Sequence, residues 1–245
     1  MKAKKGFTII ELTLAMTFVS ILLITVFILV MQITKIYTKG TSIKEVNSVG
    51  RSLLSDFNQT IGASPVKPGL GTDGNKYFMI DAAKAGGRFC TGSYSYIWNN
   101  GKTLTDIRDG VANVKANMFK TSSSNVPVRL LKVSDSSRTY CNSGDDVVTI
   151  DGSKINATEL ISSNESEVAI YDLFVYKPII DDSANASGQA LYTLSFVLGT
   201  LGNNVGEGGL IDGNNQCKAP SDAGSDFNYC AINKFDLSTR AMGSN

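Results

Sequence analysis

The chain has 245 residues and is almost electroneutral, with 23 Lys and Arg against 22 Asp and Glu, a formal net charge of +1. This balance gives no indication of nucleic-acid binding. Histidine is absent, which excludes histidine-activated nucleophiles, histidine zinc ligands and the commonest general base, whereas carboxylate or cysteine chemistry stays open.

The first 36 residues differ in character from the rest of the chain. Lys2, Lys4 and Lys5 precede Leu12 to Met31, a run of twenty uncharged and mostly aliphatic residues. As a helix rising about 1.5 Å per residue, this run would be about 30 Å long, the thickness of the hydrocarbon core of a bilayer. We therefore expect a single membrane pass, with the basic amino terminus inside the cell and everything after Ile36 outside.

One carboxylate, Glu11, stands at the start of this apolar stretch. A secretory signal peptide is the ordinary interpretation of such a start, but its apolar region is shorter and ends in a small-residue cleavage site. An unpaired carboxylate in a membrane segment is also strongly unfavourable. A cut between Gly6 and Phe7 would create a positive α-amine four residues from Glu11, and the amine of a neighbouring subunit would serve equally. The position of Glu11 therefore predicts that its positively charged partner is an α-amine created by proteolysis.

The run Lys5-Gly6-Phe7-Thr8-Ile9-Ile10-Glu11 resembles the prepilin cleavage and methylation motif of type IV pilins and type II secretion pseudopilins. The resemblance covers the leader and the apolar helix. It implies that a prepilin peptidase removes residues 1–6 after Gly6 and methylates the new amine of Phe7. It further implies that Glu11 pairs with the Phe7 amine of another subunit when the helices bundle into a filament. An ordinary signal anchor is the alternative.

The apolar periodicity continues beyond the membrane stretch, in steps of three and four residues over residues 36–61. We expect one long helix from Phe7 to about Ile61, amphipathic in its outer half, with its apolar stripe against a head domain. Because glycine in a helix interior costs about 1 kcal/mol relative to alanine, Gly40 and Gly50 are expected weak points. Some relatives unwind this helix partly on assembly, and Gly40 is the candidate here.

Two glycine-rich stretches are expected to be loops. Gly62 and Pro65 should end the helix, and a Gly/Pro-rich connector follows over residues 62–76. Within it, residues 69–74 match the G-x-G-x-x-G dinucleotide pattern, but prolines rather than a strand precede them and no clear helix follows. Residues 199–209 lack the Lys-Ser/Thr ending of a phosphate-binding loop. No cofactor is expected.

From Arg88 onward the pattern is typical of β-structure. The aromatic-rich run 89–98 leads into Asn99-Asn100-Gly101, a hairpin-turn signal. Further strands are expected over residues 103–105, 126–133, 146–150, 167–176 and 189–198, with a short helix over 154–162. Strands at short spacing after one long helix predict an α+β fold in which the helix packs on an antiparallel sheet, as in pilins.

Cys90, Cys141, Cys217 and Cys230 include no C-x-x-C pair and have no histidine companions, so zinc is not expected. All lie on the exported side, where disulfides persist. Three pairings are possible, and the residues alone leave them open. The resemblance to pilins, many of which have a disulfide-bounded region near the C-terminus, favours Cys217–Cys230 and with it Cys90–Cys141.

The C-terminal loop is rich in oxygen-bearing side chains, which are the ligands that calcium needs. Their spacing matches no EF-hand, and Asp and Asn are ordinary turn residues, so no metal is assigned. The residues concerned are Asp212, Asn214, Asn215, Asp222 and Asp226.

These features predict a structural, non-enzymatic subunit of a type IV pilus or related filament, held in the membrane before assembly and extracellular afterwards. Its segments are a leader (1–6), a membrane and filament-core helix (7–36), an outer helix (37–62) and an exported head (63–245). Expected partners are the prepilin peptidase, other pilin subunits, the assembly machinery and the membrane. The length favours a minor pilin, although major pilins and pseudopilins stay open.

The alternative from another class is a membrane-anchored exported domain that binds or catalyses and never polymerises. Tyr94, Tyr96 and Trp98 could give such a domain an exposed aromatic platform. Alternating aromatic residues on a strand more often pack in a core or across strands.

Overall fold

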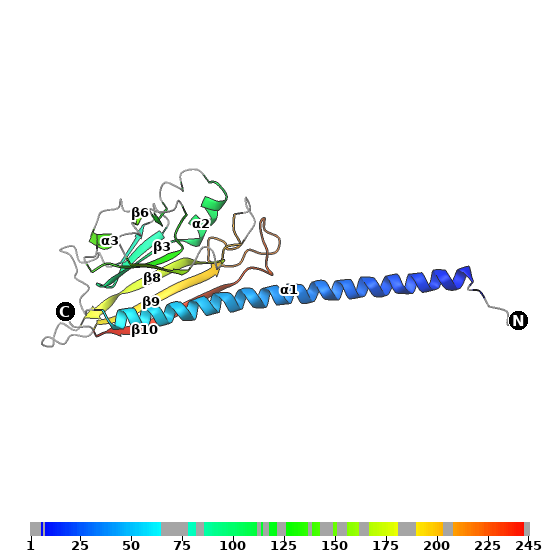
Figure 1. The fold of residues 1–245 in the computed structure, drawn as a ribbon, viewed down its shortest axis with the longest axis horizontal. Helices are drawn as coiled ribbons and strands as arrows, with labels where there is room; N and C mark the ends of the chain where they lie inside the picture. The colour runs from blue at the N-terminus through cyan, green and yellow to red at the C-terminus, as the bar shows by residue number, and fades with distance from the viewer. Residues whose placement is uncertain are drawn as a thin grey trace.

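The structure is a computed structural model that describes residue 6 and residues 8–64, 78–81, 86–111, 114, 118–121, 126–136, 139–142, 149–150, 156–161, 167–180, 190–202 and 208–242. A single long helix, α1 (Ile9–Gly62), carries a β-rich head on its carboxyl-terminal half, and its amino-terminal half extends away from the head (Figure 1). The predicted α+β class, with one long apolar helix followed by antiparallel sheets, is confirmed.

Helix α1 is 54 residues long and unbroken. It continues through Gly40, where unwinding on assembly stays a prediction, and it ends at Gly62, as predicted from the sequence. Its outer half turns one stripe toward the head, and the buried members of that stripe are Ser42, Val46, Gly50, Leu53, Phe57, Thr60 and Ile61. The three- and four-residue steps of the sequence therefore mark the face that packs.

The head contains two main antiparallel sheets. The five-stranded sheet has the order β1 (Phe78–Asp81), β2 (Gly86–Cys90), β3 (Tyr94–Asn99), β5 (Leu130–Ser134), β7 (Ala157–Ile161). The three-stranded sheet has the order β10 (Ile232–Ala241), β9 (Ala190–Thr200), β8 (Val168–Ile180). The smaller elements are the parallel pair β4 (Lys120–Thr121) and β6 (Thr149–Ile150) and the helices α2 (Gly101–Arg108) and α3 (Thr139–Asn142).

The core forms where α1 meets both sheets. The ring of Phe57 lies 4.8 Å from that of Tyr96 on β3 and 5.7 Å from that of Phe196 on β9. Phe196 in turn stacks on Phe235 of β10, with 5.3 Å between ring centroids. A Cβ on Gly50 would lie 2.1 Å from the Phe235 ring. Gly50 is therefore the point of close approach between helix and strand, and the expectation that it weakens the helix misses this packing role.

Several local predictions were wrong or incomplete. Asn99-Asn100-Gly101 is not a hairpin turn, and residues 103–105 are not a strand but lie within α2. The side chain of Asn100 accepts the Lys102 amide at 2.9 Å and caps α2, a role that asparagine fills as readily as a turn. The expected helix over 154–162 is strand β7, paired with β5. Strand β10, which pairs along β9, was not predicted, although its apolar residues alternate with polar ones from Phe235 onward.

Some predictions fall outside the described residues. These are the leader with Lys2, Lys4 and Lys5, the new terminus Phe7, Pro65, most of the 62–76 connector with the 69–74 glycine pattern, residues 146–148, and residues 203–207.

Candidate functional site

No described part of the chain covers the amino-terminal half of α1. Its large apolar side chains from Ile9 to Tyr37 are between 48% and 82% exposed. Within the described residues, α1 is the one helix whose length and composition would allow it to cross a membrane. This half of the helix can thus be a membrane anchor or a signal sequence.

The serine and threonine hydroxyls of this half are satisfied within the helix. Five hydroxyls donate to backbone carbonyls three or four residues earlier, at 2.8–3.0 Å, and they belong to Thr13, Thr17, Ser20, Thr25 and Thr34. Hydroxyls that make their hydrogen bonds within their own helix are compatible with the hydrocarbon core of a membrane, which offers no hydrogen-bond partners. Glu11 differs from these hydroxyls because it is charged, and no cation lies beside it among the described residues.

Glu11 closes a reciprocal cap with Thr8 at the start of α1. The Thr8 hydroxyl oxygen accepts the Glu11 amide at 3.3 Å, and Glu11 Oε2 accepts the amide and the hydroxyl of Thr8, each at 3.0 Å. A negative group is favourable here because the first turn of a helix is its positive end. Sequence reasoning overlooked Thr8, although the spacing T-x-x-E is itself the signature of such a cap.

The cap leaves half of the carboxylate available. Both side-chain bonds reach Oε2, and Oε1 accepts no hydrogen bond from the described residues. Gly6, the expected cleavage position, is exposed, with no atom within 4 Å of a Cβ built on it. The predicted pairing of Glu11 with a Phe7 amine stays a prediction.

A second cluster joins α1 to the carboxyl-terminal loop. Nζ of Lys39 donates to the carbonyl oxygens of Cys230 and Phe227, the latter at 3.1 Å, and lies 4.4 Å from the centroid of the Phe227 ring. Partial desolvation lowers the pKa of Lys39. Nearly two hundred residues separate these partners, and no sequence pattern links them, so sequence reasoning could not find this contact.

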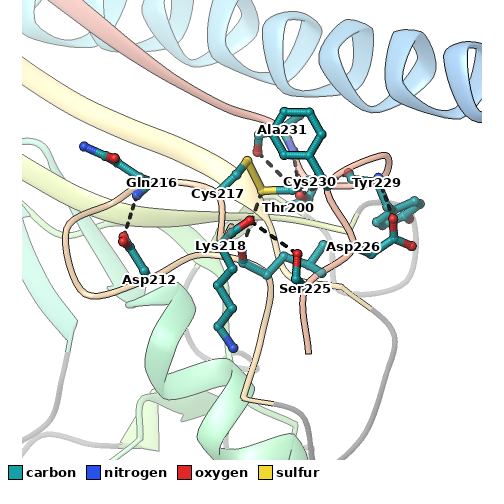
Figure 2. Close-up of a disulfide and its surroundings, with 12 residues drawn as sticks. Thr200, Asp212, Gln216, Cys217, Lys218, Ser225, Asp226, Tyr229, Cys230 and Ala231 are labelled. Carbon is teal, nitrogen blue, oxygen red and sulfur yellow. Dashed lines mark hydrogen bonds between the residues drawn. A yellow bond between two sulfur atoms is a disulfide. The ribbon is translucent and has the colours of Figure 1, made fainter. Parts of the chain in front are cut away.

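The four cysteines form two disulfides, Cys217–Cys230 and Cys90–Cys141, which is the pairing that the resemblance favoured. Figure 2 shows the first of these inside the loop that leads into β10, with the faint blue coil of α1 passing beside it. The loop is closed over 13 residues and is therefore a compact element of the head.

The acidic residues of this loop shape its turns. Asp212 accepts the amides of Asn214 and Gln216 at 2.9 and 2.8 Å, the latter visible in Figure 2. Asp222 and Asp226 likewise accept nearby backbone amides. Within the described residues no group of three or more Asp, Glu, Cys or His converges on one point. Their observed role is that of turn caps.

The aromatic run on β3 is largely core. Tyr96 and Trp98 are buried, and only Tyr94 is partly exposed. The hydroxyl of Tyr96 donates to Asp56 of α1 at 2.7 Å, and burial raises the pKa of this hydroxyl strongly. An exposed aromatic platform of Tyr94, Tyr96 and Trp98, as the alternative function would use, is therefore wrong.

Comparison with protein-family models, with curated proteins and with solved structures finds no match for this chain.

Proposed function

We propose that this protein is a pilin-like structural subunit, cut between Gly6 and Phe7, held in the membrane by the first half of α1, and then packed through the same half into a filament. The observation that supports it most directly is the position of Glu11. This residue is the lone carboxylate of the exposed apolar half of α1 and lies in the first turn of the helix, and among the described residues no group donates to its Oε1.

The exposed helix needs a partner in every state of the protein. Apolar patches larger than a few hundred Å² mark interaction sites on soluble monomers, and here a helix of some thirty residues is apolar on all sides. A bilayer satisfies such a surface before assembly, and other copies of the helix satisfy it afterwards. Both environments are open to the same side chains because the described part of the head leaves them exposed.

Glu11 distinguishes this function from simple anchoring. An anchor gains nothing from a carboxylate at the edge of its apolar segment and loses stability by burying it. The Thr8 cap satisfies Oε2 within the monomer, which makes residence in the membrane tolerable, while Oε1 can accept an ammonium group from a neighbour. The amine on Phe7 after cleavage is the counter-ion that the motif supplies, and one such contact per subunit would set the axial register of the filament.

The head fits this role as a displayed domain. It packs on residues 39–62 of α1 through the Phe57 cluster and the Lys39 contacts, so the two halves of the helix have separate tasks. We assign the subunit to the minor or priming class, since the chain is longer than many major pilins. The prepilin peptidase, other pilin subunits and the assembly machinery are its proposed partners.

The test replaces Glu11 and follows filament incorporation in cells. Glu11→Ala should leave membrane insertion and cleavage intact but sharply reduce the subunit recovered in sheared filaments, because the register contact is lost. Thr13→Val is the matched control, since the Thr13 hydroxyl bonds only to its own helix at Ile10 and its loss should leave incorporation normal. Normal incorporation of Glu11→Ala would contradict the proposed role.

A further inference from the structure

The carboxyl-terminal loop lies at the end of the head that faces the free half of α1 (Figure 1). Its point of contact with the helix is Lys39, which holds the carbonyl oxygens of Phe227 and Cys230. The disulfide to Cys217 fixes the other side of the loop. Phe227 is therefore held at a defined height along α1.

The axial position of Lys39 and Phe227 along α1 can be compared with the thickness of the hydrocarbon core and of the headgroup layer of a membrane. Lys35 is the first charged residue after Glu11, so the uncharged run continues three residues past Met31 and ends at Thr34. Lys39 lies one helical turn beyond Lys35, about 6 Å along the axis. Each headgroup layer of a bilayer is about 5–7 Å thick, so a helix that crosses the membrane places Lys39 and Phe227 within or at the outer edge of this layer.

The side chains at this height suit a bilayer surface. The Phe227 ring is 51% exposed although it lies beside the helix, and Tyr37 on α1 is exposed as well. Aromatic side chains concentrate at the headgroup level of membrane proteins, and lysines beside them are well placed for lipid phosphates. Asp226, which precedes Phe227 in the loop, accepts the backbone amides of Asn228 and Tyr229.

We propose that Phe227 and Tyr37 form an aromatic anchor that inserts into the phospholipid headgroup layer of the membrane crossed by α1, and so sets the height of the head before assembly. This inference rests on the membrane pass of the proposed function. It adds that the disulfide-bounded loop is a lipid-contacting surface of the unassembled subunit.

The test uses the full chain in phosphatidylcholine nanodiscs and reports depth by tryptophan quenching. Trp98, the single native tryptophan, is buried in the head, so wild-type protein gives the background signal. Three single variants carry the reporter: Phe227→Trp at the loop, Phe27→Trp inside the expected membrane pass, and Met242→Trp as the matched exposed control. Met242 is 70% exposed but its amide bonds to Gly62, 23 residues beyond Lys39 and thus about 35 Å farther from the membrane.

Two quenchers separate the layers: phosphatidylcholine with a nitroxide on the headgroup, and phosphatidylcholine brominated on its acyl chains. We expect the headgroup nitroxide to remove most of the added fluorescence of Phe227→Trp. The brominated chains should quench Phe27→Trp, and neither lipid should affect Met242→Trp.

The inference is overturned if neither lipid quenches Phe227→Trp, as expected for Met242→Trp, while the brominated chains quench Phe27→Trp. In that case α1 crosses the membrane, but the loop does not contact it. A blue shift of Phe227→Trp without lipid quenching would also overturn it, because the loop would be covered by a second copy of the chain. If Phe27→Trp is unaffected too, the membrane pass itself is wrong and the proposed function fails with it.

Discussion

Lys132 on β5 donates a hydrogen bond of 2.7 Å to Oδ1 of Asp56 on α1. The same Nζ donates to the Thr60 hydroxyl at 2.7 Å, and the Tyr96 hydroxyl donates to the other oxygen of Asp56. The side chains of the ion pair are only 16% and 24% exposed. This polar cluster ties the outer half of α1 to the five-stranded sheet from inside an otherwise apolar interface.

Removing the acid should therefore destabilise the head. Asp56→Ala leaves the Lys132 ammonium and the Tyr96 hydroxyl without their shared acceptor, and we expect the free energy of unfolding to fall by about 2–3 kcal/mol. Urea denaturation of the full chain in detergent, followed by Trp98 fluorescence, measures this. Asp236→Ala is the control, because the pair Lys234–Asp236 spans 3.6 Å with both side chains more than 60% exposed and should contribute less than about 0.5 kcal/mol. Equal losses in the two variants would contradict the account.

Two glycines of α1 should respond in opposite directions to the same substitution. Gly40→Ala adds a methyl group with no atom within 4 Å and should stabilise the helix by up to about 1 kcal/mol. Gly50→Ala places the methyl group 2.1 Å from the Phe235 ring and should destabilise the head by about 1–3 kcal/mol despite the better helix propensity. Thermal unfolding of the two variants side by side checks the pair, and a stabilising Gly50→Ala would show that α1 and β10 are not in close contact.

The two disulfides should differ in their contribution to stability. By loop entropy, the Cys217–Cys230 bridge over 13 residues is worth about 3 kcal/mol and the Cys90–Cys141 bridge over 51 residues about 4 kcal/mol. Double alanine variants of each pair, compared by denaturation under the same conditions, give both values. A larger loss for Cys217→Ala/Cys230→Ala would mean that the bridge acts through the Lys39 contact at Cys230 as well as through loop closure.

Much of the fold could be predicted from the sequence because its signals are long and periodic. The uncharged apolar run predicted the first half of α1, the three- and four-residue steps over residues 36–61 predicted its second half, and further apolar runs predicted β8 and β9. The errors occurred where one local pattern serves two structures, as with Asn100, whose side chain caps a helix as well as it favours a turn. Strand β10 was missed because its alternation is incomplete: Asn233 and Lys234 are adjacent polar residues, and the inward position 239 is occupied by the polar Thr239.

The candidate site, too, could be predicted from the sequence only where its signals are local. Glu11 could be selected from the sequence because a charge in an apolar run is a local anomaly. Thr8 could also have been selected from the sequence, because its spacing to Glu11 is that of a helix-capping motif. The contact of Lys39 with Phe227 and Cys230 depends on tertiary structure alone.

The mass of the amino terminus of the mature protein tests the central claim most directly. Material purified from the native cell envelope, digested and analysed by mass spectrometry, should begin at an N-methylated Phe7, and a Gly6→Val variant should keep residues 1–6. Unprocessed, unmethylated chains in the wild type would leave Glu11 without its counter-ion and would contradict the pilin-like account.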